Sequence, residues 1–108
     1  MVIKLGHKNR TEASKMIVDW LEEALDDLEA LRQYIAEENV TAANRIAKRI
    51  ISAVDLLSEQ PNIGRHGRVS GTRELVISET PFIIPYCVEK KTVQILRVFH
   101  SAMLWPEV

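Results

Sequence analysis

The chain has 108 residues, 46% of them hydrophobic and 27% charged, and its 14 Lys and Arg against 15 Asp and Glu give a net charge of -1. This length supports one small domain with a single hydrophobic core. Apolar runs of only a few residues exclude a transmembrane helix, and the first 15 residues lack the apolar stretch of a secretory signal. A single cysteine, Cys87, excludes an internal disulfide. No Cys/His spacing suits zinc, so we expect neither a metal nor a cofactor.

Charge is distributed unevenly along the chain. Residues 19–38 carry eight acids and one base, whereas residues 45–73 carry six bases and two acids. A neutral protein with this asymmetry can still present one basic face. For Arg45, Lys48 and Arg49 we favour a solvated helix surface over a binding site.

The first half of the chain predicts a strand and two helices. Residues 1–15 are polar and unpatterned, so we interpret them as a flexible leader, an upstream start or an expression remnant, with the domain spanning 16–108. Ile17–Trp20 predicts a short strand. Residues 21–37 and 42–58 show helical periodicity, and Thr41 or Asn39 is a suitable N-cap for the second helix. The apolar stripe of the first comprises Leu21, Leu25, Leu28, Leu31 and Ile35, and that of the second Ala43, Ile46, Ala47, Ile50, Ala53, Val54 and Leu57.

The second half predicts three strands in an antiparallel meander. Arg73–Ile77, Phe82–Val88 and Thr92–Phe99 are rich in β-branched and aromatic residues and are separated by short turns. Pro85 predicts either a bulge or an amide position that faces an unpaired side. The fold class is therefore α+β, in the order β-α-α-β-β-β, with a helical hairpin on one face of a small, mostly antiparallel sheet and the other face open.

Residues 62–70, read as NIGRHGRVS and called the basic segment below, are the first candidate site. Two glycines beside Arg65, His66 and Arg68 predict a mobile cationic loop that exposes backbone donors, which suits phosphate or another anionic target. An ordinary surface loop, in which the glycines serve turns, is equally compatible with this composition. The P-loop spacing is absent.

Four further residues are candidates for RNA cleavage without a metal. Such cleavage requires a base, cations around the phosphorane and an acid. Arg73 and Arg97 are candidate phosphate-binding cations, and we expect Arg97 to project from the open face of the sheet. His100 is a candidate acid/base, although a surface or hydrogen-bonded role is more common at a strand end. Tyr86 is either a core residue with its hydroxyl bonded or a stacking surface for a base.

Five motifs in unbroken order, from Met16 to Pro106, resemble the RelE/ParE superfamily of toxins. They are WLEEALDDLEALRQYIAEEN, AANRIAKRI, SEQPNIGRHGRVSGTRELV, PFIIPYCV and VQILRVFHSAMLWP. The resemblance implies the toxin of a bacterial type II toxin–antitoxin module, acting in the cytoplasm without a membrane. It also implies a cognate antitoxin that wraps the toxin, with operator DNA bound only through the antitoxin.

The superfamily divides by target. RelE-type members are ribosome-dependent mRNA endonucleases, and Glu74, Val76 and Ile83 stand where their catalytic cations are expected. ParE-type members lack the nuclease residues and poison DNA gyrase. The resemblance therefore favours gyrase inhibition over mRNA cleavage and leaves open whether the chain is an enzyme. A non-toxic or decayed module that still binds an antitoxin is the third possibility.

Overall fold

The protein is described by a computed structural model in which residues 15–102 are placed. The predicted α+β class and the predicted element order are confirmed, with one short strand added at residues 65–66 and the last predicted strand divided into two. The leader, apart from Lys15, lies outside the described residues. The elements are β1 (Ile17–Trp20), α2 (Glu22–Ala36), α3 (Val40–Leu56), β2 (Arg65–His66), β3 (Arg73–Val76), β4 (Phe82–Glu89), β5 (Thr92–Ile95) and β6 (Phe99–His100).

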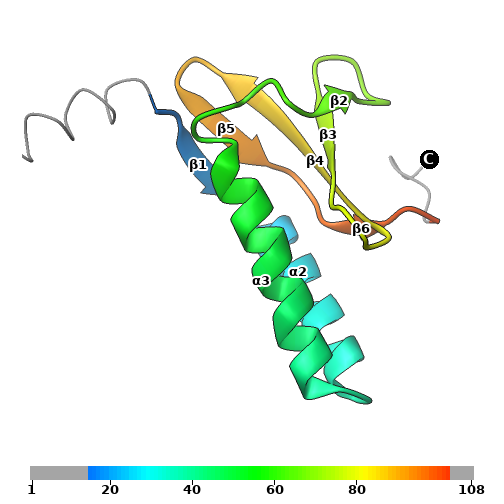
Figure 1. Ribbon diagram of the computed structural model, residues 1–108. Coiled ribbons are helices and arrows are strands. Elements are labelled where there is room, and N and C mark those ends of the chain that lie inside the picture. Colours follow the sequence, from blue (N-terminus) through cyan, green and yellow to red (C-terminus); the bar gives the residue numbers. More distant parts are fainter. Residues whose placement is uncertain (1–14, 103–108) are drawn as a thin grey trace, which may run out of the picture.

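The strands form one sheet in the order β1-β5-β4-β3-β2, and β6 pairs with β4 (Figure 1). The predicted meander is confirmed, because β3, β4 and β5 pair antiparallel in sequence. Strand β1 pairs parallel with β5, with Val18 opposite Val93. This parallel pair is possible because the whole helical hairpin lies between β1 and the rest of the sheet in the chain, which provides the long crossover that parallel strands require.

The helical hairpin packs on one face of the sheet and extends beyond its edge (Figure 1). Helix α3 begins after Asn39, whose side-chain oxygen accepts a hydrogen bond from the backbone N–H of Ala42 at 2.9 Å. Such a cap satisfies one of the free N–H groups at a helix start. Helix α3 buries its predicted stripe at Ala43, Ala47, Ile50 and Val54.

Helix α2 is rotated relative to the predicted stripe. Its fully buried residue is Ala24, whereas Leu25 is half-exposed, so placing Leu25 in the core was wrong. Leu28 and Leu31 pack against the core as expected. Ala24 belongs to the buried core cluster together with Ile84 and Tyr86 of β4 and Val93 and Ile95 of β5. Within residues 15–102, no helix is long and apolar enough to cross a membrane.

The third predicted strand is interrupted, contrary to the expectation of one strand over 92–99. Tyr86 pairs with Ile95 and Ile83 pairs with Phe99, so two residues of β4 lie opposite the three residues 96–98. The extra residue makes a bulge. Pro85 explains its position, because its carbonyl accepts a bond from the Leu96 N–H at 2.9 Å but it has no N–H to return one.

The sheet face opposite the helices is not fully open. Glu74, Ile83, Pro85 and Phe99 alternate onto this face, and all four are buried. The side chains of Arg65 and Arg68 contact Glu74, and the Arg68 guanidinium also lies 5.6 Å from the centre of the Phe99 ring. The basic segment therefore covers part of the face that was expected to be free.

Candidate functional site

The basic segment is held from below by two side chains of the sheet. The Tyr86 hydroxyl accepts a hydrogen bond from the Gly64 N–H at 2.9 Å and donates one to the Pro61 carbonyl at 2.8 Å. Arg73, opposite Tyr86 in the ladder, donates from Nη1 to the carbonyls of Asn62 and Gly64 at 3.1 and 2.7 Å. These bonds link the chain after α3 to β3 and β4.

The surroundings of Tyr86 decide between its two predicted roles. Its side chain has no exposed surface, and both hydrogen-bonding functions of its hydroxyl are used within the protein. Burial raises the pKa of the Tyr86 phenol above its usual value, while the Gly64 N–H and the Arg73 charge act in the opposite direction. Tyr86 is thus a core residue with a satisfied hydroxyl, and the alternative of a stacking surface was wrong.

A buried carboxylate lies beneath the two arginines of the basic segment. Glu74 is only 2% exposed and is the charged residue buried in the core of the described chain. Its Oε1 accepts hydrogen bonds from Arg65 Nε and Nη2 at 3.3 and 3.0 Å. Its Oε2 accepts a hydrogen bond from the backbone N–H of Arg68 at 3.1 Å. Arg68 Nε lies 3.5 Å from the same Oε2. Both arginine side chains remain substantially exposed, at 55% and 40%.

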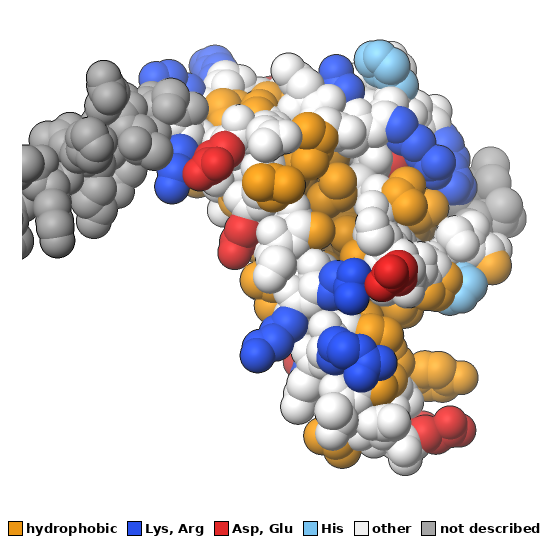
Figure 2. Space-filling view, in the orientation of Figure 1, with side chains coloured by type: hydrophobic (Ala, Val, Ile, Leu, Met, Phe, Trp, Pro, Cys, Tyr) orange, Lys and Arg blue, Asp and Glu red, His pale blue; other side chains and the backbone are white. Residues whose placement is uncertain are grey.

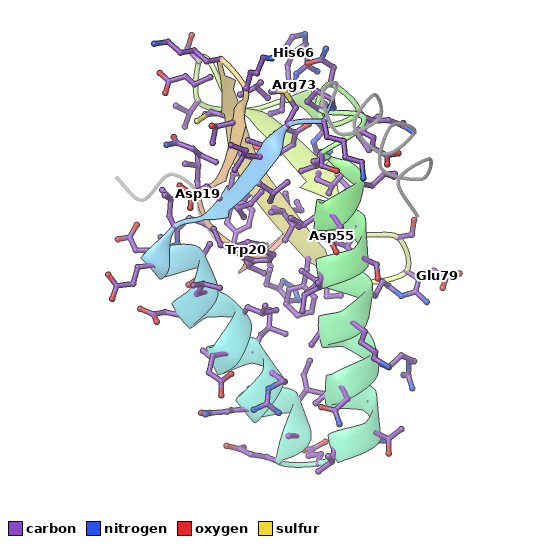
Figure 3. The ribbon with its side chains drawn as sticks, turned by 90° about the vertical axis from the view of Figure 1, so that its left-hand side faces the viewer. Asp19, Trp20, Asp55, His66, Arg73 and Glu79 are labelled. Atoms are coloured by element: carbon purple, nitrogen blue, oxygen red, sulfur yellow. The ribbon has the colours of Figure 1, made fainter. Side chains whose placement is uncertain are left out.

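The basic segment is consequently more ordered than a mobile loop with free donors. The N–H groups of Gly64, Gly67 and Arg68 are bonded within the protein, to Tyr86, Thr72 and Glu74. Gly64 serves close approach rather than a turn, since an added Cβ would lie 2.6 Å from the Tyr86 hydroxyl oxygen. What the segment presents outward is its side chains, including the exposed His66 opposite Arg73 in the ladder (Figure 3).

The bulge after β5 turns Arg97 toward the helices, so its predicted place on the open face was wrong. Its Nε and Nη2 donate to the two carboxylate oxygens of Asp27 on α2, at 2.7 and 3.1 Å. The same carboxylate accepts from the Val98 N–H at 2.9 Å. Asp27 therefore bonds a backbone group that the strand interruption leaves without a ladder partner, and it fixes the end of β5 to α2.

His100 lies at the margin of an apolar groove between α2 and β6. The groove has a volume of about 530 Å³. The imidazole packs edge-on against Phe82, with ring centres 5.9 Å apart, and its Nδ1 accepts from the Ala102 N–H at 3.0 Å. Its Nε2 carries the proton when the ring is neutral. The groove is lined by Asp27, Ala30, Leu31, Tyr34, Ile35, Phe82, Arg97, Val98, Phe99 and His100.

The four nuclease candidates therefore fall into two groups. Arg73 and Tyr86 lie beneath the basic segment, whereas Arg97 and His100 line the groove beside α2. In the part of the chain that the structure describes, no group of His, Cys, Asp or Glu side chains could hold a metal ion. Basic side chains gather over α3 and again over the β2–β3 region, with hydrophobic surface between them (Figure 2).

Sequence reasoning missed the structural roles of Asp27 and Glu74. Asp27 lies four residues before Leu31, on the inner side of α2, which was a usable signal that it meets the sheet. Glu74 was recognised only as a departure from the nuclease pattern. As the acid directly after Arg73 in a predicted strand, it was a plausible partner for the nearby arginines.

The comparisons with known proteins agree with this fold. The family model described as the ParE toxin of the type II toxin–antitoxin system parDE matches residues 18–105. The chain belongs to the ParE toxin family. It is 42% identical to a candidate toxin, Y4kP of Sinorhizobium fredii, over 88% of this chain and 98% of that protein. It is also 41% identical to Toxin RelE2 of Caulobacter vibrioides, over 81% of this chain and 97% of that protein.

Two solved structures share the architecture. A chain of the chromosomal ParDE system from P. aeruginosa matches with a TM-score of 0.73 and 29% identity, covering 81% of this chain and 97% of that one. A chain of the RelBE2 toxin–antitoxin complex from Mycobacterium tuberculosis matches with a TM-score of 0.58 and 23% identity, over 80% and 91% of the two chains. The second likeness concerns the fold alone. The predicted membership of the RelE/ParE superfamily is confirmed.

Proposed function

We propose that this ParE-family toxin inhibits cell growth by contacting DNA gyrase, and that a cognate antitoxin neutralises it. The observation that carries the choice of target is the separation of the nuclease candidates. Arg73 and Tyr86 bond the backbone of the basic segment, and Arg97 bonds Asp27. A phosphorane would need several of these groups around one point. Binding to a protein target needs only an exposed surface, which Arg65, His66 and Arg68 provide.

The antitoxin is proposed to bind over the helical hairpin. The groove beside α2 offers an apolar surface, and α3 presents half-exposed Ile51 and Leu56. Arg45, Lys48 and Arg49 lie on the same helix. An antitoxin segment with hydrophobic and acidic residues would match both features. Operator DNA would then be bound through the antitoxin, and the complex would act in the cytoplasm.

Ribosome-dependent mRNA cleavage is the second candidate function. Two observations favour it: Arg97 and His100 line one groove, and one relative carries the name Toxin RelE2. In that case His100 would act as acid/base, with Arg97 and Arg73 holding phosphate and the basic segment holding RNA. Tyr86 would have to leave the core to stack on a base, which makes this the less favoured candidate.

A purified-gyrase supercoiling assay combined with induction in cells tests the proposal. We expect the wild-type chain to inhibit supercoiling, and its induction to cause an SOS response and loss of DNA synthesis before loss of translation. The antitoxin should reverse both effects. Early loss of translation with cut mRNA would replace gyrase by the ribosome. Normal growth on induction, with antitoxin binding retained, would identify a non-toxic module.

A further inference from the structure

Glu74 differs from the other charged residues of the described chain in its burial. Its side chain is 2% exposed, yet it faces two guanidinium groups and one backbone N–H. A buried carboxylate is costly unless it is paired and hydrogen-bonded. Here that cost is offset by bonds that all go to one surface segment.

The two carboxylate oxygens of Glu74 hold different arginines. Oε1 accepts hydrogen bonds from the side chain of Arg65, which lies directly opposite Glu74 in the β2–β3 ladder. Oε2 bonds the backbone of Arg68 and lies close to its Nε. The guanidinium of Arg68 is also placed over the Phe99 ring. Each arginine is thereby held at its inner side while much of its side chain remains exposed.

Tyr86 and Arg73 hold the start of the basic segment and the residue before it. Pro61, Asn62 and Gly64 are held by these two side chains. Free arginine side chains lose considerable conformational entropy when a partner immobilises them. Orientation before binding reduces that loss, and it also limits the shapes of partner that the two arginines can meet together.

From this geometry we propose that Glu74 is a positioning residue. Its carboxylate holds Arg65 and Arg68 in the orientation in which they contact the target protein. This inference rests on the proposed role of the basic segment in target binding. It assigns Glu74 no contact with the target itself, because its side chain is enclosed.

Two substitutions distinguish the positioning of Arg65 and Arg68 from a simple effect of the Glu74 charge. Glu74→Gln leaves one acceptor oxygen and places an NH₂ donor where the second oxygen was, so it can hold only one of the two arginines. Glu74→Asp keeps both oxygens and the charge but is one methylene shorter. The matched control is Glu79→Gln, which removes the exposed carboxylate partner of Arg49 at the β3–β4 turn, far from Arg73 and His66 (Figure 3).

We expect both Glu74 variants to need about tenfold more protein to half-inhibit gyrase, a difference equivalent to about 1.4 kcal/mol. Glu79→Gln should match wild type. NMR of the arginine Nε–H groups gives a readout that does not depend on the target. In wild type, the Nε–H signals of Arg65 and Arg68 should be distinct and should exchange slowly with water. In Glu74→Gln, at least one of the two signals should exchange faster. Circular dichroism establishes that each variant is folded. If Glu74→Gln does not fold, the potency of Glu74→Asp tests the proposal.

The result that overturns positioning is a folded Glu74→Asp, or a folded Glu74→Gln, with wild-type potency. A wrong choice of target would give a different result from a wrong role for Glu74. If wild-type protein leaves gyrase active but still arrests growth, the gyrase target is wrong, and growth arrest becomes the readout for the same variants. If the wild-type chain does neither, both proposals are wrong.

Discussion

Asp27 and Arg97 are 70 residues apart in sequence, yet they form a two-bond ion pair, with Arg97 Nε and Nη2 donating to the two carboxylate oxygens at 2.7 and 3.1 Å. Less than a third of either side chain is exposed. The pair connects α2 to the bulge between β5 and β6, and the Val98 N–H shares the same carboxylate. It therefore holds one wall of the groove to the other.

Asp27→Ala should destabilise the protein by about 2–3 kcal/mol, because it removes the carboxylate that accepts hydrogen bonds from the Arg97 guanidinium and from the Val98 N–H. Urea unfolding measures this loss. In a double-mutant cycle with Arg97→Met, we expect a coupling energy of about 1–2 kcal/mol. Additive effects of the two substitutions would contradict a direct pair. The Glu29–Arg32 pair, which lies exposed on one helix, is the control and should give a much smaller coupling.

Tyr86→Phe should lower the free energy of unfolding by about 1–3 kcal/mol, since the Gly64 N–H and the Pro61 carbonyl lose their buried partner. For a domain of this size the melting temperature should fall by several degrees. Tyr34→Phe is the control, because Tyr34 is 76% exposed. Equal melting temperatures for Tyr86→Phe and wild type would show that the hydroxyl contributes nothing.

The same residue predicts an alkaline loss of stability. The pKa of Tyr86 is raised in the folded protein, chiefly by burial, so the unfolded chain loses the phenolic proton first. The stabilisation is complete below the ordinary tyrosine pKa of about 10 and decreases as pH rises above it. Denaturant titrations from pH 8 to 11 should show a steeper decline for wild type than for Tyr86→Phe. Parallel curves would exclude Tyr86 as the source.

Gly64→Ala should disturb the basic segment more than Gly71→Ala. A Cβ on Gly64 would lie 2.7 Å from Tyr86 Cε1 and 3.0 Å from the Glu74 carbonyl oxygen, so the chain must shift at a cost of about 1–3 kcal/mol. Gly71 has a φ of +84° but open space around its Cβ position, so only the backbone cost of about 1 kcal/mol applies. Unfolding measurements on both variants test this order, and a larger loss for Gly71→Ala would reverse it.

Charge reversal on α3 tests the antitoxin surface. Replacing Arg45 and Lys48 with Glu should weaken antitoxin binding at least fivefold, with the difference decreasing at high salt, because an acidic segment would lose attraction and gain repulsion. Calorimetric titration at two salt concentrations measures both effects. Lys90 and Lys91, at the turn between β4 and β5, offer a control reversal away from the hairpin. Unchanged affinity for the α3 variant would remove the electrostatic part of the proposal.

His100→Ala separates the two candidate targets. A gyrase inhibitor does not need the imidazole as acid or base. The amount of His100→Ala protein that arrests growth should therefore stay within about twofold of the wild-type amount. Loss of the Phe82 ring contact costs little, since His100 is exposed. Growth assays after induction, with protein levels matched, give the result. Abolished toxicity in a folded variant would favour mRNA cleavage.

The sequence alone determined the family, the order of elements, the helical hairpin and the antiparallel meander, because these depend on local periodicity, short connections and recognisable motifs. The N-cap at Asn39 and the buried stripe of α3 could also be predicted from the sequence alone. Each requires only that neighbouring residues repeat at the spacing of a helix or a strand.

Only the tertiary structure decided where the charged side chains go. One extra residue opposite Pro85 rotates Arg97 from the open face to Asp27, and no local pattern reveals a bulge that depends on two strands. The net charge of -1 does not reveal that Glu74 is buried beneath Arg65 and Arg68. That pairing follows from the β2–β3 register, which places side chains from separate segments within hydrogen-bonding distance.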